Sequence, residues 1–252
     1  MTGIYFSGTG NTKYCVEKFM ECCDGGKTVS IESPDVVGAI RASDFIVLGY
    51  PVYFSNVPRI VKDFLILNGS ELKHKRVFII STMGLFSGDG AGCGARLLKK
   101  CGASIVGGLH LKMPDCIGDS KLLKKSLEQN KLLIKSAESK IARAAHALKK
   151  GSPTKDGLSF INQIAGLFGQ RLWFYRKTQG YTDKLKIYAD SCIGCGKCAT
   201  ACPMGNLSIS NQKAKHEGKC TMCYRCINTC PQKAITLLGD QVIEQCIFEK
   251  YV

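Results

Sequence analysis

Eight cysteines between Cys192 and Pro231 carry the clearest chemical signal in the sequence. They form two identical runs of the spacing C-x2-C-x2-C-x3-C-P, namely Cys192, Cys195, Cys198, Cys202-Pro203 and Cys220, Cys223, Cys226, Cys230-Pro231. Three closely spaced thiolates of each run can hold one cluster, while the fourth reaches the other cluster. The spacing predicts two [4Fe-4S] clusters, one on Cys192, Cys195, Cys198 and Cys230, the other on Cys220, Cys223, Cys226 and Cys202.

The two runs belong to an internal repeat, because a shift of 28 residues also superimposes Leu207 on Ile235 and Ile209 on Leu237. Zinc is the alternative for paired cysteines, but a tetrahedral zinc site uses two pairs that a longer loop separates. The region resembles the two-cluster bacterial ferredoxins over about 50 residues, in its cysteines, both prolines and the apolar strand after each run. This resemblance implies one-electron transfer.

A second motif, Ser7-Gly8-Thr9-Gly10-Asn11-Thr12, joins an apolar stretch at Thr2 to Phe6 to an amphipathic helical pattern. Glycines and small hydroxyl side chains let backbone N–H groups surround an anion at the positive end of the helix. The motif matches neither the Walker A loop nor the dinucleotide fingerprint. It predicts a phosphate site, with a plain turn that caps the helix as the alternative.

Strands and helices alternate through the first half of the chain, which predicts a parallel sheet covered by helices on both faces. The expected strands are Thr2–Phe6, Thr28–Ile31, Phe45–Tyr50, Arg76–Thr82 and Ser104–Leu111, and the expected helices include Pro58–Leu67 and Ala91–Cys101. In such folds ligands bind beyond the carboxyl ends of the strands. The loops that follow the third and fourth strands are therefore candidate ligand loops.

These features together resemble the flavodoxins over about the first 150 residues. The resemblance implies that FMN is the ligand and that Ser7, Thr9, Gly10, Asn11 and Thr12 bind its phosphate. It also implies that the later loops hold the flavin ring, with Tyr53 or Phe54 packed on it. The residues of these two loops are Pro51, Val52, Tyr53, Phe54, Ser55 and Asn56, then Thr82, Met83, Gly84, Ser87 and Gly88. Simple turns are the alternative for both loops.

From Lys121 to Lys150 apolar residues recur at helical spacing opposite a face rich in lysine and arginine. One long amphipathic helix is predicted, with its apolar face on the sheet and its basic face solvated or docked to a partner. The apolar stretch 158–175 is expected to pack between two modules, or alternatively to lie on a membrane surface. We therefore expect a flavodoxin-like domain at 1–151, a connecting segment at 152–183 and a two-cluster domain at 184–252.

The formal net charge is +15. Two clusters and a flavin phosphate would lower it to about +9, which favours a partner with an acidic surface. The sequence has no motif for nucleic-acid binding. It also has no charged leader and no run of about 18 apolar residues, and cluster thiolates need a reducing compartment, so a cytoplasmic location is expected.

The expected fold class is α/β, a flavodoxin-like doubly wound parallel sheet of five strands followed by a small α+β two-cluster ferredoxin domain. The chain is similar to the flavodoxin–ferredoxin fusions of anaerobic bacteria and archaea. That similarity implies electron transfer between low-potential [4Fe-4S] clusters and FMN, in the service of a partner redox enzyme. A flavin-dependent reductase of a small acceptor is the alternative. A basic scaffold with structural metal sites is a third hypothesis, which requires a colourless protein.

Overall fold

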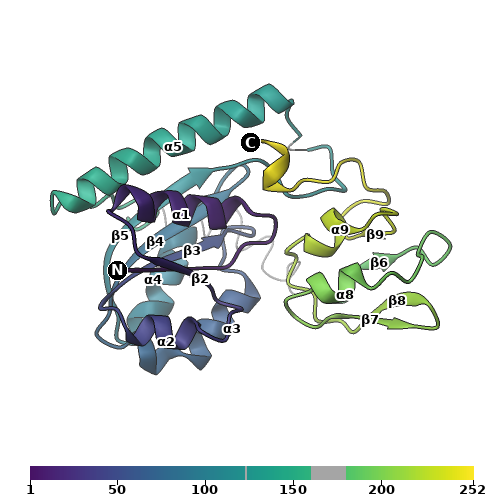
Figure 1. Ribbon diagram of the computed structural model, residues 1–252, viewed down its shortest axis with the longest axis horizontal. Coiled ribbons are helices and arrows are strands. Elements are labelled where there is room, and N and C mark those ends of the chain that lie inside the picture. The colour runs from purple at the N-terminus through teal and green to yellow at the C-terminus, as the bar shows by residue number, and fades with distance from the viewer. Residues whose placement is uncertain (123, 160–179) are drawn as a thin grey trace.

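The computed structural model describes residues 1–122, 124–159 and 180–252. Its larger part is a five-stranded sheet in which every neighbouring pair is parallel and the order is β2-β1-β3-β4-β5. The strands are β1 (Thr2–Tyr5), β2 (Lys27–Ser30), β3 (Phe45–Pro51), β4 (Arg76–Met83) and β5 (Ser104–Lys112). This topology confirms the predicted doubly wound parallel sheet (Figure 1).

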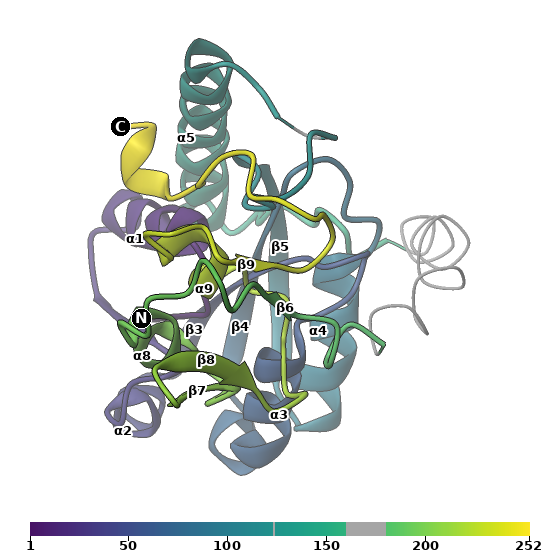
Figure 2. The ribbon, with the colours of Figure 1, turned by 90° about the vertical axis from the view of Figure 1, so that its right-hand side faces the viewer.

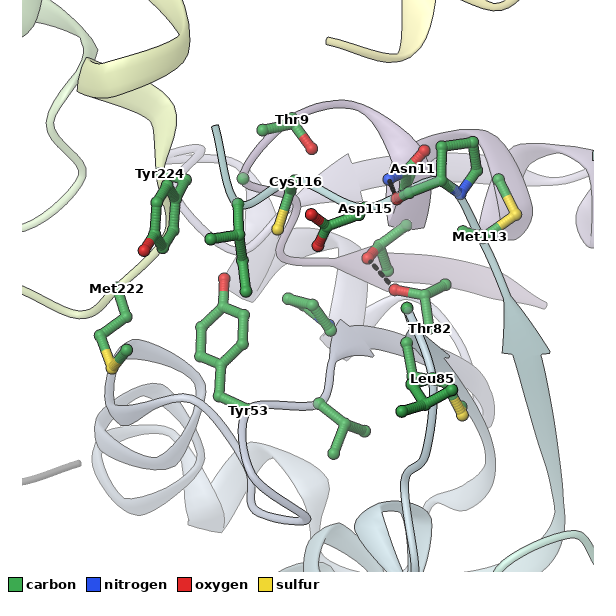
Figure 3. Close-up of a pocket in the computed structure, with 18 of the residues that line it drawn as sticks. Thr9, Asn11, Tyr53, Thr82, Leu85, Met113, Asp115, Cys116, Met222 and Tyr224 are labelled. Carbon is green, nitrogen blue, oxygen red and sulfur yellow. Dashed lines mark hydrogen bonds between the residues drawn. The ribbon is translucent and has the colours of Figure 1, made fainter. Parts of the chain in front are cut away.

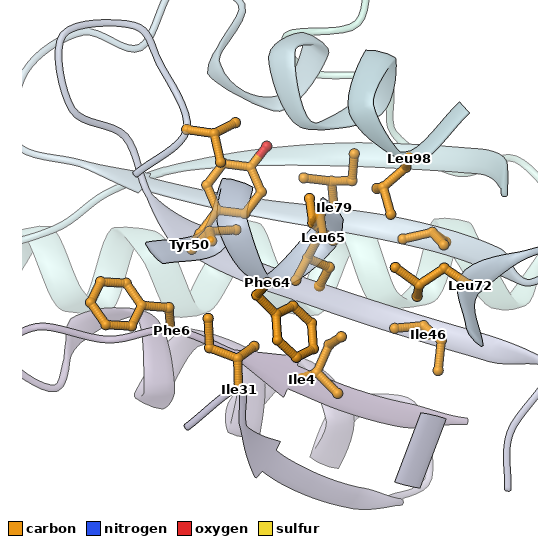
Figure 4. Packing of buried hydrophobic residues seen from close by; sticks show 14 of the residues in the cluster. Ile4, Phe6, Ile31, Ile46, Tyr50, Phe64, Leu65, Leu72, Ile79 and Leu98 are labelled. Carbon is orange, nitrogen blue, oxygen red and sulfur yellow. The ribbon is translucent and has the colours of Figure 1, made fainter. Parts of the chain in front are cut away.

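Helices cover both faces of the sheet, as expected because the inner strands β3 and β4 are buried along nearly their whole length. One face packs against α2 (Val36–Arg41), α3 (Arg59–Leu67) and α4 (Gly90–Lys100), and Figure 4 shows this core. The other face packs against α1 (Asn11–Cys22) and α5 (Leu127–Lys149). A 3₁₀ turn, η1 (Gly69–Leu72), follows α3. Helix α2 is absent from the sequence prediction because its six residues show too little periodicity.

Helix α5 begins later than predicted, at Leu127 instead of Lys121. Ser126 sets this start through a capping box: its Oγ accepts from Gln129 N at 3.2 Å, and Ser126 N donates to Gln129 Oε1 at 3.0 Å. Lys124 lies before the cap, and its Nζ donates to the Ile117 carbonyl oxygen at 2.7 Å. The apolar face of α5 packs on α1 and β5, as expected.

The smaller part of the chain consists of two short antiparallel sheets and two single-turn helices, which confirms the predicted small α+β domain. β6 (Lys186–Ile187) pairs with β9 (Ile235–Thr236), and β7 (Leu207–Ser210) pairs with β8 (Lys213–His216). The helices α8 (Lys197–Ala201) and α9 (Arg225–Thr229) occupy equivalent positions of the 28-residue repeat. Figures 1 and 2 place this domain beyond the carboxyl ends of the sheet strands.

Two segments outside the sheet also pack on the larger part. Gly108 N of β5 donates to the Thr154 carbonyl oxygen at 2.8 Å, so the chain after α5 runs along the sheet. At the other end, η3 (Phe248–Lys250) returns to the first loop, where Phe248 N donates to the Thr9 carbonyl oxygen at 2.8 Å. The apolar stretch predicted between the modules falls largely on residues 160–179, outside the described residues. No helix in the described ranges is both long enough and apolar enough to cross a membrane.

Candidate functional site

A cavity of about 320 Å³ lies at the carboxyl edge of the sheet. It is bordered by the loops that follow β1, β3, β4 and β5, and on its far side by the small domain. Figure 3 shows side chains from all these segments pointing into one space. The predicted flavin-site residues that line it are Ser7, Thr9, Asn11, Thr12, Pro51, Val52, Tyr53, Phe54, Thr82, Met83 and Gly84.

The loop after β1 offers the polar groups that a phosphate and a sugar chain require. Helix α1 starts at Asn11 with no side-chain cap and no acidic residue in its first turn, so its positive end faces the loop. The Thr12 and Thr82 hydroxyls lie 2.7 Å apart and are buried. Asn11 Nδ2 donates to the Pro114 carbonyl oxygen at 2.8 Å, while Asn11 Oδ1 is buried without a partner among the described residues. This acceptor suits a ribityl hydroxyl, so the loop fits FMN.

The loop after β3 is a tight turn that presents an aromatic ring. Tyr53 and Asn56 exchange two backbone hydrogen bonds of 3.1 and 3.0 Å, and Phe54 and Ser55 between them have φ of 49° and 57°. Left-handed residues other than glycine cost about 1 kcal/mol each and concentrate at functional sites. Burial raises the pKa of Tyr53 well above its ordinary value, so the ring enters the cavity as a neutral phenol.

Five predicted flavin-site residues do not line the cavity: Gly10, Ser55, Asn56, Ser87 and Gly88. Ser87 and Gly88 line a separate hollow beside α5 instead. There the Ser87 hydroxyl lies 2.8 Å from His110 Nδ1 on β5. Burial lowers the pKa of His110 to about 4, so its imidazole is neutral at pH 7.

The loop after β5 also borders the cavity, which the sequence reasoning missed although it follows a strand end like the others. Within this loop the Asp115 side chain is 8% exposed, and Lys124 Nζ lies 3.4 Å from its Oδ2. Burial raises the pKa of Asp115, and the nearby Lys124 offsets part of that shift. Leu85 and Phe86 also line the cavity, within the stretch from Thr82 to Gly88 that was expected to border the flavin. The lining residues missed by sequence reasoning are Gly8, Met113, Pro114, Asp115, Cys116, Ile117, Ser120, Leu122, Met222, Tyr224 and Leu238.

The eight motif cysteines gather around two small cavities in the other domain. One is lined by Cys192, Cys195, Cys198 and Cys230, the other by Cys202, Cys220, Cys223 and Cys226. Each cavity thus takes three cysteines from one run and the fourth from the other, which is the crossed arrangement predicted from the spacing. The four cysteines of each set border a cavity and do not converge on one point, since among the described residues no three or more His, Cys, Asp or Glu side chains are grouped closely enough to hold a single metal ion.

Backbone N–H groups donate to the sulfurs of the first and the fourth cysteine of each run. Ala214 N lies 3.4 Å from Cys192 Sγ, and Met222 N lies 3.4 Å from Cys220 Sγ. The fourth cysteines receive the same contact at 3.3 Å, Cys202 from Asn206 N and Cys230 from Ala234 N. Hydrogen bonds to cluster sulfurs are a recurring means of tuning reduction potentials, so the donor set fits [4Fe-4S] clusters.

The two domains meet at the phosphate loop. Arg225 of α9 binds both oxygens of Glu32 at 2.8 Å and donates to the Ser7 carbonyl oxygen at 2.8 Å. On the other side of the cavity, Asp119 Oδ2 accepts from the backbone N–H of Leu237 at 2.5 Å and of Leu238 at 2.9 Å. These contacts fix the position of the cluster domain relative to the flavin cavity.

Two family models match the chain. Residues 4–101 match a flavodoxin domain, and residues 184–231 match a 4Fe-4S dicluster domain. Among solved structures, the two-electron reduced flavodoxin of Megasphaera elsdenii is 24% identical, with a TM-score of 0.41, over 57% of this chain and 100% of that one. An archaeal flavodoxin is 14% identical, with a TM-score of 0.42, over 59% of this chain and 99% of that one.

Curated relatives match the cysteine-rich end. An uncharacterised ferredoxin of Methanocaldococcus jannaschii is 35% identical over 68 residues, which are 24% of this chain and 43% of that protein. One component of an ion-translocating oxidoreductase complex of Methanosarcina acetivorans is 47% identical over 47 residues, 18% of each chain. The chain thus spans less than half of these two relatives. It spans 87% of a ferredoxin of Methanothermococcus thermolithotrophicus, with 40% identity over 52 residues, which are 19% of this chain.

Proposed function

We propose that this chain, which joins a flavodoxin domain to a 4Fe-4S dicluster domain of the ferredoxin family, transfers electrons between its clusters and its flavin for a partner redox enzyme. FMN and [4Fe-4S] clusters are its cofactors. The clusters supply one-electron chemistry, and FMN can exchange one or two electrons. The chain itself binds these groups and fixes the spacing between them.

One observation carries the proposal: the flavin cavity has one wall from each domain. Tyr53 lines the cavity from the flavodoxin side, and Met222 and Tyr224, which flank the proposed cluster ligand Cys223, line it from the other domain (Figure 3). A flavin held in this cavity would lie beside a cluster of the same molecule. Tethering of two redox centres at such a distance is useful mainly when electrons pass between them.

A rapid-mixing experiment tests the electron path. Reduction of the clusters by a low-potential donor should reduce the flavin of the same molecule, at a rate independent of protein concentration once the donor step is saturated. Cys192→Ala should slow that step. A rate that rises in proportion to protein concentration would mean transfer by collision between molecules and would contradict the proposal.

The partner is proposed to carry an acidic docking surface. The chain has 35 lysines and arginines against 20 acidic residues. Opposite charges speed the encounter of redox partners and make it sensitive to salt. The observed rate with a true partner should therefore fall as salt is added. A cytoplasmic location is proposed as well, because cluster thiolates need a reducing compartment.

A flavin-dependent reductase of a small acceptor is the second candidate, and Asp115 is the observation that favours it. Its carboxyl lines the cavity and has a raised pKa, so it could deliver a proton beside the flavin. Saturable turnover of a small acceptor, lost in Asp115→Asn while flavin content stays normal, would support the reductase. Electron delivery to proteins alone would support the carrier.

A further inference from the structure

We propose that Tyr224 is the contact across which the flavin exchanges electrons with the cluster of Cys202, Cys220, Cys223 and Cys226, here called the inner cluster. The cluster of Cys192, Cys195, Cys198 and Cys230, the outer cluster, is then the one that the partner protein reaches. This inference rests on the proposed function and adds an order to its three redox centres. One electron crosses at each transfer, no bond forms or breaks, and a one-electron redox protein supplies or accepts that electron at the outer cluster.

Tyr224 forms a wall shared by two cavities. It lines the flavin cavity and also the cavity of the inner cluster cysteines, and no other described residue lines both. Within the described ranges, no residue that lines the outer cluster cavity reaches the flavin cavity. The tyrosine ring is buried, and its hydroxyl lies near Asp119 without closing a standard hydrogen bond. Tyr224 is therefore the described residue that borders both sites.

The internal repeat shows that this tyrosine is specific to one of its halves. Gly194, Gly196 and Gly205 have φ of 66°, 77° and 56° in the first half. Their counterparts in the second half are Met222, Tyr224 and Lys233, and the same left-handed backbone is kept with φ of 59°, 60° and 51°. Side chains are disfavoured in this conformation and persist mainly where they have a function. Two of these three side chains, those of Met222 and Tyr224, line the flavin cavity.

The corresponding face of the outer cluster is open. A Cβ at Gly196 would meet no heavy atom within 4 Å, whereas Tyr224 at the equivalent position is 3% exposed. Cys195 is exposed, and the neighbouring Ile193 is 61% exposed. The repeat thus buries one cluster loop against the flavin cavity and leaves its twin at the surface, where a partner protein can approach.

The test replaces the tyrosine ring without changing the fold of the loop. Tyr224→Gly restores the residue found in the first half of the repeat and removes the wall. Lys233→Gly is the matched control, because it relaxes the same left-handed backbone but does not touch the cavity. Tyr224→Phe keeps the ring and removes only the hydroxyl. The readouts are FMN affinity, from flavin fluorescence on protein stripped of FMN with its clusters intact, and the rate of flavin reduction at saturating FMN.

Loss of an aromatic wall should weaken FMN binding about tenfold in Tyr224→Gly, and Lys233→Gly should stay within about twofold of the unaltered protein. Flavin reduction should slow in Tyr224→Gly and be nearly normal in Tyr224→Phe. An unchanged rate of flavin reduction in Tyr224→Gly at saturating FMN would overturn the inference, whatever the change in affinity. Flavin reduction by collision between molecules of the unaltered protein would contradict the proposed function instead. The FMN affinities would still show whether Tyr224 forms a wall of the flavin cavity.

The order of the clusters has its own measurement. Cys220→Ala removes a ligand of the inner cluster, and Cys195→Ala removes one of the outer cluster. The visible circular dichroism of bound FMN reports its immediate surroundings, so Cys220→Ala should change it more than Cys195→Ala does. The opposite ranking would place the outer cluster beside the flavin and reverse the proposed order.

Discussion

Gly8 of the phosphate loop meets the carbonyl oxygen of Cys223 backbone to backbone, so that a Cβ on Gly8 would lie 2.3 Å from that oxygen. The obstacle is main chain and cannot rotate away. Gly8→Ala should therefore push the two domains apart at a cost of about 1–3 kcal/mol. We expect weaker FMN binding and faster proteolysis between the domains.

Gly38→Ala in α2 is the control for that variant, because a Cβ there would meet nothing within 4 Å. It should stabilise the protein by about 0.5–1 kcal/mol, since alanine favours the helix over glycine. Equal flavin affinity in the two variants would show that the contact between Gly8 and Cys223 is not needed to shape the cavity.

Arg225 should couple the two domains through its two hydrogen bonds to the Glu32 carboxylate. The pair is about one quarter exposed, with side-chain exposures of 24% and 29%, so it is partly shielded from solvent. A lysine cannot bind both carboxylate oxygens and the Ser7 carbonyl together. Arg225→Lys, Glu32→Gln and the double variant should give a coupling free energy of about 1 kcal/mol or more in urea unfolding.

The exposed pair Lys18 and Glu21 is the control for this cycle, with exposures of 40% and 66%. Surface pairs of this kind contribute about 0.2–0.5 kcal/mol. If the coupling free energy of Arg225 with Glu32 were no larger than that of Lys18 with Glu21, the Arg225 ion pair would not hold the domains together.

The sheet and most of its helices could be predicted because their signals are local. The run from Phe45 to Tyr50 is apolar throughout and is preceded by Asp44 and followed by Pro51, and the observed strand extends it by one residue. The helix predicted from Lys121 began too early, because periodicity does not reveal a cap. Ser126 with Gln129 three residues later is a readable capping-box signal that the sequence reasoning passed over.

The flavin cavity was only half predictable. Thr12 and Tyr53 follow strand ends, so the topology of a parallel sheet locates them. Asp115 follows the fifth strand and could have been found by the same rule. Met222 and Tyr224 could not have been found in this way. They lie about 170 positions from Tyr53 in the sequence, and they reach the cavity only because the two domains dock. The sequence held one indication: where the first half of the repeat has Gly194 and Gly196, the second half has Met222 and Tyr224.

Crossed ligation makes a prediction about which cluster a variant damages. Cys202 lines the cavity of Cys220, Cys223 and Cys226, although it belongs to the first run. Cys202→Ala should therefore alter the electron paramagnetic resonance signal of the inner cluster, and Cys230→Ala that of the outer cluster. Signals that change in the reverse pairing would mean that each run ligates a single cluster.

Thr12→Asp should expel the flavin. The Thr12 side chain is 1% exposed and lies at the start of α1, beside the expected phosphate position. A carboxylate about 4 Å from a phosphate charge is repelled by about 4 kcal/mol at an effective dielectric constant of 20, which lowers affinity at least a hundredfold. Iron content should be normal. Thr12→Ser keeps the hydroxyl and should keep the flavin. If Thr12→Asp held as much FMN as the unaltered protein, the loop after β1 would not be the phosphate site.

His110 should resist protonation far below its ordinary range. Burial lowers its pKa from 6.5 to about 4, with Asp156 opposing and Lys140 reinforcing that shift. A lowered pKa means that the folded state prefers the neutral ring, so this part of the stability is complete above about pH 6.5 and is lost as pH falls toward 4. Between pH 6.5 and 5 the loss is up to about 2 kcal/mol. His110→Gln cannot titrate and should lose correspondingly less stability over this interval. In nuclear magnetic resonance titrations the His110 ring signal should stay at its neutral position down to pH 5, whereas a midpoint near pH 6.5 would show that the imidazole is solvated and that burial does not hold it neutral.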